Sequence, residues 1–341
     1  MGALTWARLS FRQQRWELIL VVIGVAAVAA AMLYFATTLD GMRAASPECL
    51  ANLDTFVDDG SGPAASCQAV LNSYYEAYNW GTNFVNLAWL APFGMGVILG
   101  APLVAREIDG GTAQLAWSLS RSRVGWLLRR IAFVTLFGLG LLAVVTVMSG
   151  LLTGAMFPEK TLGEDFIYFG RRDLPVVARG FGALMVGVLV GAIVGRVLPA
   201  ILASVLVIGL VFTGLSFAHD QWNRGEARVQ RFYDDSGTSI PFDMSGLDVG
   251  YGLQRPNGEF LSYGDAYASG ILIETYQDEQ GRVYASMADM DAGRLVGHDA
   301  RSSIPGERYP DLVLRDSGVA VLVGVVALGL TAVVVRRRRP R

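Results

Sequence analysis

The chain has 341 residues, of which 52% are hydrophobic and only 17% are charged, and its formal net charge is −2. Its mean hydropathy is +0.41. This composition excludes an ordinary soluble domain and indicates an integral membrane protein, with no net positive charge of the kind that would favour a nucleic-acid partner.

Six stretches lack Asp, Glu, Lys and Arg and are long enough, at roughly 18–23 residues, to cross about 30 Å of hydrocarbon as helices. We place them near residues 18–37, 83–104, 131–153, 180–195 with a further turn at each end, 198–217 and 318–335. The first follows arginines, as a signal peptide does, but exceeds the usual h-region of about 7–15 residues, so we expect it to be retained. We predict an all-α polytopic membrane protein with six transmembrane helices.

The distribution of arginine predicts the orientation. If the N-terminus is cytoplasmic, the inner segments are 1–17, 105–130, Arg196 and the tail, which together hold 14 of the 28 basic residues and three of the 30 acidic ones. Short loops rich in basic residues stay in the cytoplasm. We therefore expect a multi-pass plasma-membrane protein with both termini cytoplasmic.

Residues 1–17 place Arg8, Arg12 and Arg15 on one helical face beside tryptophans. This pattern predicts a cytoplasmic helix that contacts anionic membrane lipid, or else a charge cluster that only sets topology. The remaining predicted boundaries are a membrane region at 18–217, an extracytoplasmic insert at 218–316, and a last helix with its basic tail at 317–341.

The extracytoplasmic loop at 38–82 contains the only two cysteines, Cys49 and Cys67. An oxidising compartment favours a disulfide between them, which would stabilise the loop by roughly 3 kcal/mol. The alternative is two unpaired thiols, because sequence spacing does not give geometry.

A polar segment at 105–130 separates the second and third spans. After Gly110 and Gly111, residues 112–121 read TAQLAWSLSR, which predicts a short amphipathic helix that Asp109 or Thr112 is placed to cap. At about eight residues this helix is too short to be stable alone in water. It needs either the bilayer surface or a groove on a cytosolic protein, and the residues alone leave both open.

The fourth span has a small residue at every fourth position: Ala183, Gly187, Gly191 and Gly195. In lipid, this spacing lets two helix backbones approach closely, so it predicts a helix-packing seam, within one subunit or between two. Pro92, Gly96, Gly100 and Pro102 predict a bend in the second span.

The insert at 218–316, between helices 5 and 6, changes from a helical to an extended pattern. DVGYGLQ and EFLSY flank a turn at Asn257-Gly258, and ILIETY and RVYASM flank DEQG. Each pair predicts a β-hairpin, so we expect a small extracytoplasmic β-rich insert.

Motifs for chemistry are weak throughout the sequence. The predicted spans contain no ionisable residue to carry an ion gradient, and GAMFPEKT at 154–161 has Glu159 where a phosphate-binding loop requires glycine. No catalytic motif or metal-ligand spacing stands out. We therefore expect no catalytic residue, no metal and no cofactor, and an energy source outside this chain.

Residues 100–130 closely resemble the cytoplasmic coupling segment of permease subunits of type-2 ATP-binding-cassette (ABC) exporters, especially an actinobacterial group. The resemblance rests on Ala105-Arg106-Glu107, Gly111 to Trp117, Ser120-Arg121 and Trp126 to Leu128, and it extends more weakly to the rest of the chain. Asp109 replaces a Glu common in that family, and Leu119 stands where many members have proline.

The resemblance implies an ABC exporter in which a separate cytosolic ATPase hydrolyses ATP and acts on a pair of permease subunits, identical or different. It implies a drug, antibiotic, lipid or other amphiphile as cargo. It also assigns the ATPase-coupling role to one group of residues: Arg106, Glu107, Asp109, Gly111, Thr112, Leu115, Trp117, Leu119 and Arg121. The alternative function is a non-transporting receptor or immunity protein that acts through its extracytoplasmic insert.

Overall fold

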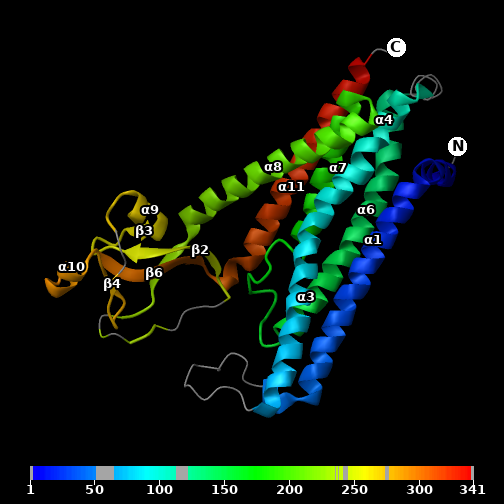
Figure 1. Ribbon diagram of the computed structural model, residues 1–341. Coiled ribbons are helices and arrows are strands. Elements are labelled where there is room, and N and C mark those ends of the chain that lie inside the picture. The colour runs from blue at the N-terminus through cyan, green and yellow to red at the C-terminus, as the bar shows by residue number, and fades with distance from the viewer. Residues whose placement is uncertain are drawn as a thin grey trace. The chain divides into compact units, whose positions relative to one another are not determined.

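The computed structural model describes residues 3–50, 65–112, 122–234, 236, 238–240, 245–272 and 276–338. The described chain is mostly helical, with a small antiparallel sheet toward the C-terminus (Figure 1). It divides into two compact units. A helix unit contains residues 1–159, 168–212 and 313–341, and a strand unit contains residues 160–167 and 213–312.

Six helical segments in the described residues are long and apolar enough to cross a membrane, in agreement with the predicted number. They are Arg15–Ala45, Cys67–Asp109, Arg123–Met156, Leu174–Val194, Val197–Glu226 and Gly306–Arg337. All but the fourth are clearly longer than the apolar stretches predicted from sequence. The helices continue into polar sequence, because helical hydrogen bonding does not stop where hydropathy falls.

The long helices of the helix unit are α1 (Ala3–Ala45), α3 (Ala65–Met95), α4 (Ala101–Asp109), α6 (Arg123–Met156) and α7 (Leu174–Val194). α1 covers both the basic N-terminal stretch and the first predicted span. α8 (Val197–Glu226) and α11 (Tyr309–Arg337) each run from one unit into the other. α7 is the most enclosed, since 72% of its apolar stretch is buried, against 11 to 56% in the other five.

The bend predicted in the second span is a change of helix type. α3 contains Pro92 and ends at Met95, and Gly96–Gly100 then form a π-helical turn, η1, before α4 begins. A π turn commonly accommodates a local irregularity in a helix. Here it brings the backbone of Gly96 and Gly100 against α7.

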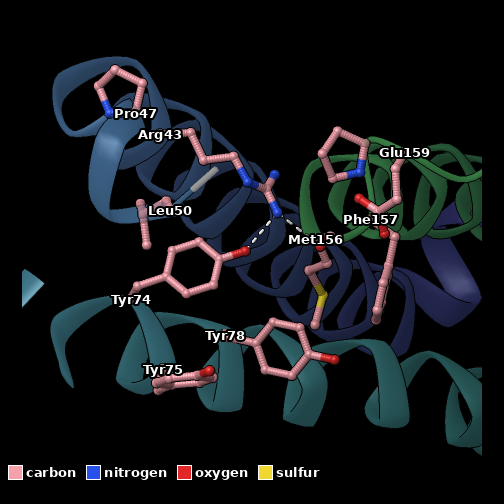
Figure 2. Close-up of a pocket in the computed structure, with 10 residues that line it drawn as sticks. Arg43, Pro47, Leu50, Tyr74, Tyr75, Tyr78, Met156, Phe157 and Glu159 are labelled. Atoms are coloured by element: carbon pink, nitrogen blue, oxygen red, sulfur yellow. Dashed lines mark hydrogen bonds between the residues drawn. The ribbon is translucent and has the colours of Figure 1, made fainter. Parts of the chain in front are cut away.

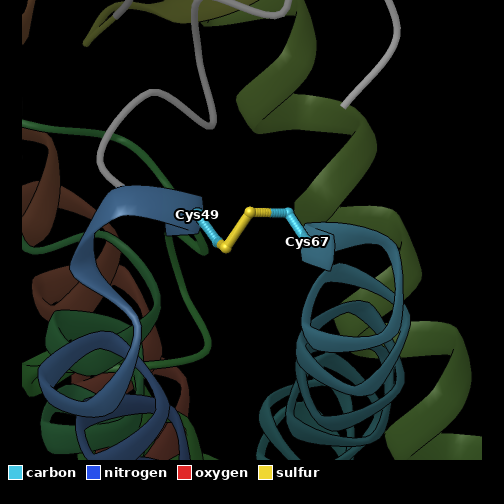
Figure 3. The surroundings of a disulfide bond; sticks show 2 residues. All are labelled: Cys49 and Cys67. Carbon is cyan, nitrogen blue, oxygen red and sulfur yellow. A yellow bond between two sulfur atoms is a disulfide. The ribbon is translucent and has the colours of Figure 1, made fainter. Parts of the chain in front are cut away.

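Cys49 and Cys67 form a disulfide that joins α2 (Pro47–Leu50) to the first turns of α3, with 5.4 Å between the two Cα atoms (Figure 3). Behind it, Leu39, Leu50 and Leu71 belong to a buried cluster shared by α1, α3 and α6. The bond therefore closes residues 50–66 into a loop at one end of this cluster.

The strand unit is built on one six-stranded antiparallel sheet. Its strands are β1 (Arg228–Arg231), β2 (Leu247–Gln254), β3 (Phe260–Ser262), β4 (Tyr276–Gln277), β5 (Arg282–Tyr284) and β6 (Gly297–Ile304). Both predicted hairpins form, β2 with β3 and β4 with β5, with Gly258 and Gly281 at positive φ in the turns. β6 has no counterpart among the predicted strands; it pairs with β1, β2 and β5 and thereby joins the hairpins.

The strand unit also has short helices and a core of its own. The helices are α9 (Tyr263–Ala268), α10 (Met287–Asp291) and the 3-10 turn η2 (Gly306–Arg308). Leu253, Ala266, Leu272 and Val283 are almost fully buried together. Phe166 donates its amide to the Ser245 carbonyl at 2.9 Å, so the 160–167 segment belongs to this unit.

Candidate coupling site

The predicted coupling residues that the structure describes lie at the end of α4. Arg106, Glu107 and Asp109 occupy its last turn, and the chain then turns through Gly111, whose φ of +69° suits glycine. Figure 1 shows this end of α4 at the same end of the helix unit as the start of α1 and the end of α11. The other predicted coupling residues, Leu115, Trp117, Leu119 and Arg121, lie outside the described residues.

Glu107 is at the centre of a buried polar cluster. Its Oε1 lies 2.9 Å from Nη1 of Arg130 on α6, and both side chains are only 7% exposed. Its Oε2 accepts a hydrogen bond of 2.6 Å from the hydroxyl of Thr112. Arg130 also donates from Nε to the Leu103 carbonyl at 3.1 Å. Both charges are thus paired and hydrogen-bonded, which a buried ion pair requires.

Two further contacts join the end of α4 to neighbouring helices. Arg106 pairs with Glu17 on α1, and the Asp109 carboxylate accepts from the Val197 amide at 3.3 Å, at the first turn of α8. A carboxylate at a helix N-terminus accepts from an otherwise unpaired amide and interacts favourably with the helix dipole. The end of α4 is therefore attached to α1, α6 and α8.

Ser122 and Arg123, which follow the undescribed residues 113–121, also form contacts with the helix unit. The Ser122 hydroxyl caps α6 by accepting from the Gly125 amide at 3.0 Å. Arg123 donates to the Arg338 carbonyl at 2.9 Å, just beyond α11, and Arg338 donates to the Ala192 carbonyl near the end of α7. Guanidinium groups thus satisfy the carbonyls that two helix C-termini leave unpaired.

The described residues on either side of 113–121, Thr112 and Ser122 to Arg123, therefore both contact other parts of the helix unit. Thr112 binds Glu107, and Glu107 binds Arg130, which lies two turns after Ser122 on α6. A force applied to 113–121 would reach α4 and α6 directly through these contacts. The described charges of this cluster are thus paired with one another, and their contacts join α4 to α6.

Sequence reasoning assigned no role to Arg130, Glu17 or Arg338. Glu17 could have been recognised from the sequence as a candidate ion-pair partner, because it is the only acidic residue among the first 39. Arg130 and Arg338 sit among other arginines, and nothing in their local sequence separates them from residues that only set topology. Their partners are far away in the chain, so their roles become visible only in the fold.

The small residues of α7 pack against η1 and α4 of the same chain. A β carbon on Gly96 would lie 2.6 Å from the Ala183 backbone, and β carbons on Gly187 and Gly191 would overlap the backbones of Gly96 and Ala101. Gly195 has a different role, because it ends α7 in the left-handed conformation with φ +68°. This seam fixes α4 against the most enclosed helix.

The opposite ends of α1 and α6 border a cavity of about 580 Å³ (Figure 2). Tyr74, Tyr75 and Tyr78 of α3 line it together with Met156 and Phe157 at the end of α6. This cavity was not predicted, because tyrosines at such spacing are equally typical of a helix packed in a core.

A family model described as ABC-2 membrane transporter related matches residues 22–219. Comparisons with curated proteins and with solved structures gave no match. The matched region runs from α1 to α8 and includes the candidate coupling site and the α7 seam. With six helices suited to crossing a membrane in the part of the chain that the structure describes, this is a multi-pass permease-type membrane protein, and it belongs to the ABC-2 membrane transporter related family.

Proposed function

We propose that this chain is the membrane-spanning permease subunit of an ABC exporter, driven by a separate cytosolic ATPase. The ATPase binds residues 105–130, with Leu115 and Trp117 on the apolar face of the helix that enters its groove. Both termini are then cytoplasmic, in the plasma membrane, and the strand unit lies outside the cell. ATP is hydrolysed in the partner, and this chain contributes no catalytic residue.

The observation that carries this proposal is that the described residues on both sides of 113–121 are anchored, within the region of the family match. Thr112, Glu107 and Arg130 connect the first end of the segment to α4 and α6, and Arg123 connects the second end to α11. A segment that only rested on the bilayer would need no buried ion pair behind it. A segment that receives force from another protein does need such a rigid attachment.

Two copies of the permease, or this chain and a related one, form the translocation path between them. The cargo is a drug, antibiotic, lipid or other amphiphile that moves outward. The contacts of the α7 seam lie within one chain, so we assign the subunit interface to other surfaces, such as exposed apolar side chains on α8 and α11.

The test is co-purification with the ATPase encoded nearest to this chain's gene. Trp117→Asp and Leu115→Pro should lower the amount of ATPase recovered at least tenfold, because they remove the apolar face or break the short helix. Tyr267→Asp in the strand unit is the matched control, since Tyr267 is 46% exposed and the same change should not affect recovery. Unchanged ATPase recovery and cargo export in both coupling variants would refute the proposal.

The strand unit favours one competing function, a receptor or immunity protein, because it has its own sheet and core. Its removal separates the two functions. The Nη2 atom of Arg308 lies 3.4 Å from Oε2 of Glu226, which places the end of α8 and η2 within reach of each other's side chains, so a flexible Gly-Ser linker replaces residues 227–305 in this variant. An exporter should still bind its ATPase and change its hydrolysis rate after this excision, whereas a receptor should lose all function.

A further inference from the structure

The cavity near the end of α1 and the end of α6 has walls of mixed character. Its floor is deeply buried, with Leu50, Tyr74 and Met156 between 2 and 6% exposed. Its rim is open, because Tyr75 is 48% exposed and Glu159 is also exposed. The volume of about 580 Å³ lies within the range of small-molecule sites, roughly 300–1,000 Å³.

Four aromatic rings face this space from two directions. Tyr74 and Tyr75 are adjacent in α3, Tyr78 lies about one turn further along it, and Phe157 follows α6 (Figure 2). The Tyr78 and Phe157 rings meet edge to face with centroids 5.8 Å apart, and Tyr74 stacks on Tyr78 at 6.5 Å. Aromatic faces carry partial negative charge and attract cations that have an apolar surface.

Arg43 is the one cationic side chain in the described wall, and its guanidinium is already engaged. It donates to the Tyr74 hydroxyl at 2.5 Å, to the Met156 carbonyl at 2.9 Å and to the Ala155 carbonyl. Those carbonyls belong to the last turn of α6, where the helix dipole supplies roughly half a negative charge. Arg43 therefore serves as a cap for α6, and much of its charge is offset.

Glu159 supplies a negative charge beside the rings. It lines the same cavity as Tyr74 and Tyr78, so its carboxylate is near the aromatic wall. Among the ion pairs of the described residues, none includes Glu159. A carboxylate at the rim of an aromatic cavity favours a positively charged ligand over a neutral or negative one of the same shape.

We propose that this cavity binds lipophilic organic cations, which have an apolar body and a delocalised or alkylated positive charge. Tyr75 and Tyr78 contact the apolar body, and Glu159 pairs with the charge at the rim. The identification of such a cation as cargo rests on the proposed exporter function, but the binding itself does not. The proposal thus narrows the cargo from amphiphiles in general to cationic ones.

The test uses the full chain in nanodiscs of neutral lipid, without any ATPase. Tetraphenylphosphonium and tetraphenylborate are nearly identical in shape and opposite in charge, so they form the matched probe pair. Binding is measured by equilibrium dialysis, with empty nanodiscs subtracted. Wild-type protein should bind the cation, and should bind it at least tenfold more tightly than the anion.

Glu159→Gln and Tyr75→Leu should each weaken binding of the cation about tenfold, in line with the usual strength of a cation–aromatic contact. Both positions are solvent-exposed enough to leave folding intact. Tyr34→Leu is the control, because Tyr34 is 62% exposed on α1 and does not line the cavity, and binding should stay within twofold of wild type.

Equal or tighter binding of tetraphenylborate would overturn the proposal, as would unchanged cation affinity in both variants. The result is independent of the coupling test. Cation binding without ATPase recovery would leave the site in place and refute the exporter, whereas ATPase recovery without cation binding would refute only this inference.

Discussion

At the α7 seam of the helix unit the backbones of neighbouring helices are in direct contact, whereas the strand unit relies on a small apolar core. In the helix unit, Gly187 and Gly191 of α7 meet the backbones of Gly96 and Ala101 so closely that no β carbon fits. In the strand unit, Leu253, Leu272 and Val283 are buried together beside the sheet. The first arrangement suits lipid, where apolar burial gives no drive, and the second suits water.

The two units also differ in how deeply their ion pairs are buried. Glu107 and Arg130 of the helix unit are each 7% exposed, and they connect two helices. In the strand unit, Arg282 pairs with Asp278 four residues earlier and is 46% exposed. A buried pair is costly to break, while an exposed local pair contributes little. The comparison therefore predicts which changes each unit tolerates.

The largest effect is expected at the α7 seam. Gly187→Leu should prevent folding of the helix unit, because the obstructing atoms are backbone of Gly96 and Ala101 and cannot move aside. The measurement is the yield of monodisperse protein after detergent extraction. Gly140→Leu and Gly209→Leu are matched controls, because a β carbon there meets nothing within 4 Å. A normal yield of Gly187→Leu would show that backbone contact is not what holds this unit together.

The next effect is expected at the buried ion pair. Glu107→Gln leaves the Arg130 guanidinium buried without its carboxylate, which should cost roughly 3–5 kcal/mol of unfolding free energy. The measurement is thermal unfolding in detergent. Glu17→Gln is the control, because its partner Arg106 is 40% exposed and the loss should stay below about 1 kcal/mol. Equal losses in the two variants would contradict the difference in burial on which this prediction rests.

The sequence predicted the number and approximate centres of the membrane helices, because an uncharged apolar run of about 20 residues is typical of a membrane-spanning helix. It placed their ends too early: α8, predicted at 198–217, continues to Glu226. Just before the uncharged stretches predicted at 180–195 and 318–335, Arg179 of α7 and Asp316 of α11 form a 2.7 Å pair inside the helix unit. Hydropathy locates a helix, but its ends depend on partners elsewhere in the fold.

Local signals also predicted both β-hairpins but not the strand that joins them. Asn257-Gly258 and the DEQG turn identify hairpins within a few residues of sequence. β6, GHDARSSI, is polar and lacks a clear alternation, and its partners lie up to 75 residues away in the chain. The Glu107–Arg130 pair was not predicted for the same reason, since it depends on how α4 and α6 pack. Sequence patterns therefore predicted local structure here, but they did not predict the contacts between distant segments.

In the strand unit, the largest effect should come from its core. Leu253→Ala removes a side chain that is fully buried with Ala266 and Val283, and should cost about 2–4 kcal/mol. The measurement is hydrogen exchange of the β2 and β6 amides, which should accelerate while exchange in α7 stays unchanged. Tyr251→Ala in the same strand is the control, because Tyr251 is 51% exposed. Equal acceleration in both variants would argue against a separate core.

The smallest effect concerns acid and the exposed pair of Asp278 and Arg282. Partial burial alone would raise the pKa of Asp278, but hydrogen bonds from the Arg282 amide and side chain, with the Arg282 charge, outweigh it and lower the pKa. A lowered folded-state pKa adds stability above the unfolded value of about 4, and that stability is lost as pH falls through the folded value. Asp278→Asn should therefore be less stable than wild type at pH 7 and should converge with it in acid. Hydrogen exchange of the β5 amides, corrected for its intrinsic pH dependence, measures this convergence.

The control is Glu279→Gln, which removes the same charge one residue away. Its stability should change with pH in the same way as that of wild type, because among the described contacts Glu279 forms no ion pair. If Asp278→Asn instead ran parallel to wild type down to about pH 3, the contribution of this exposed pair would be indistinguishable from that of an isolated surface carboxylate.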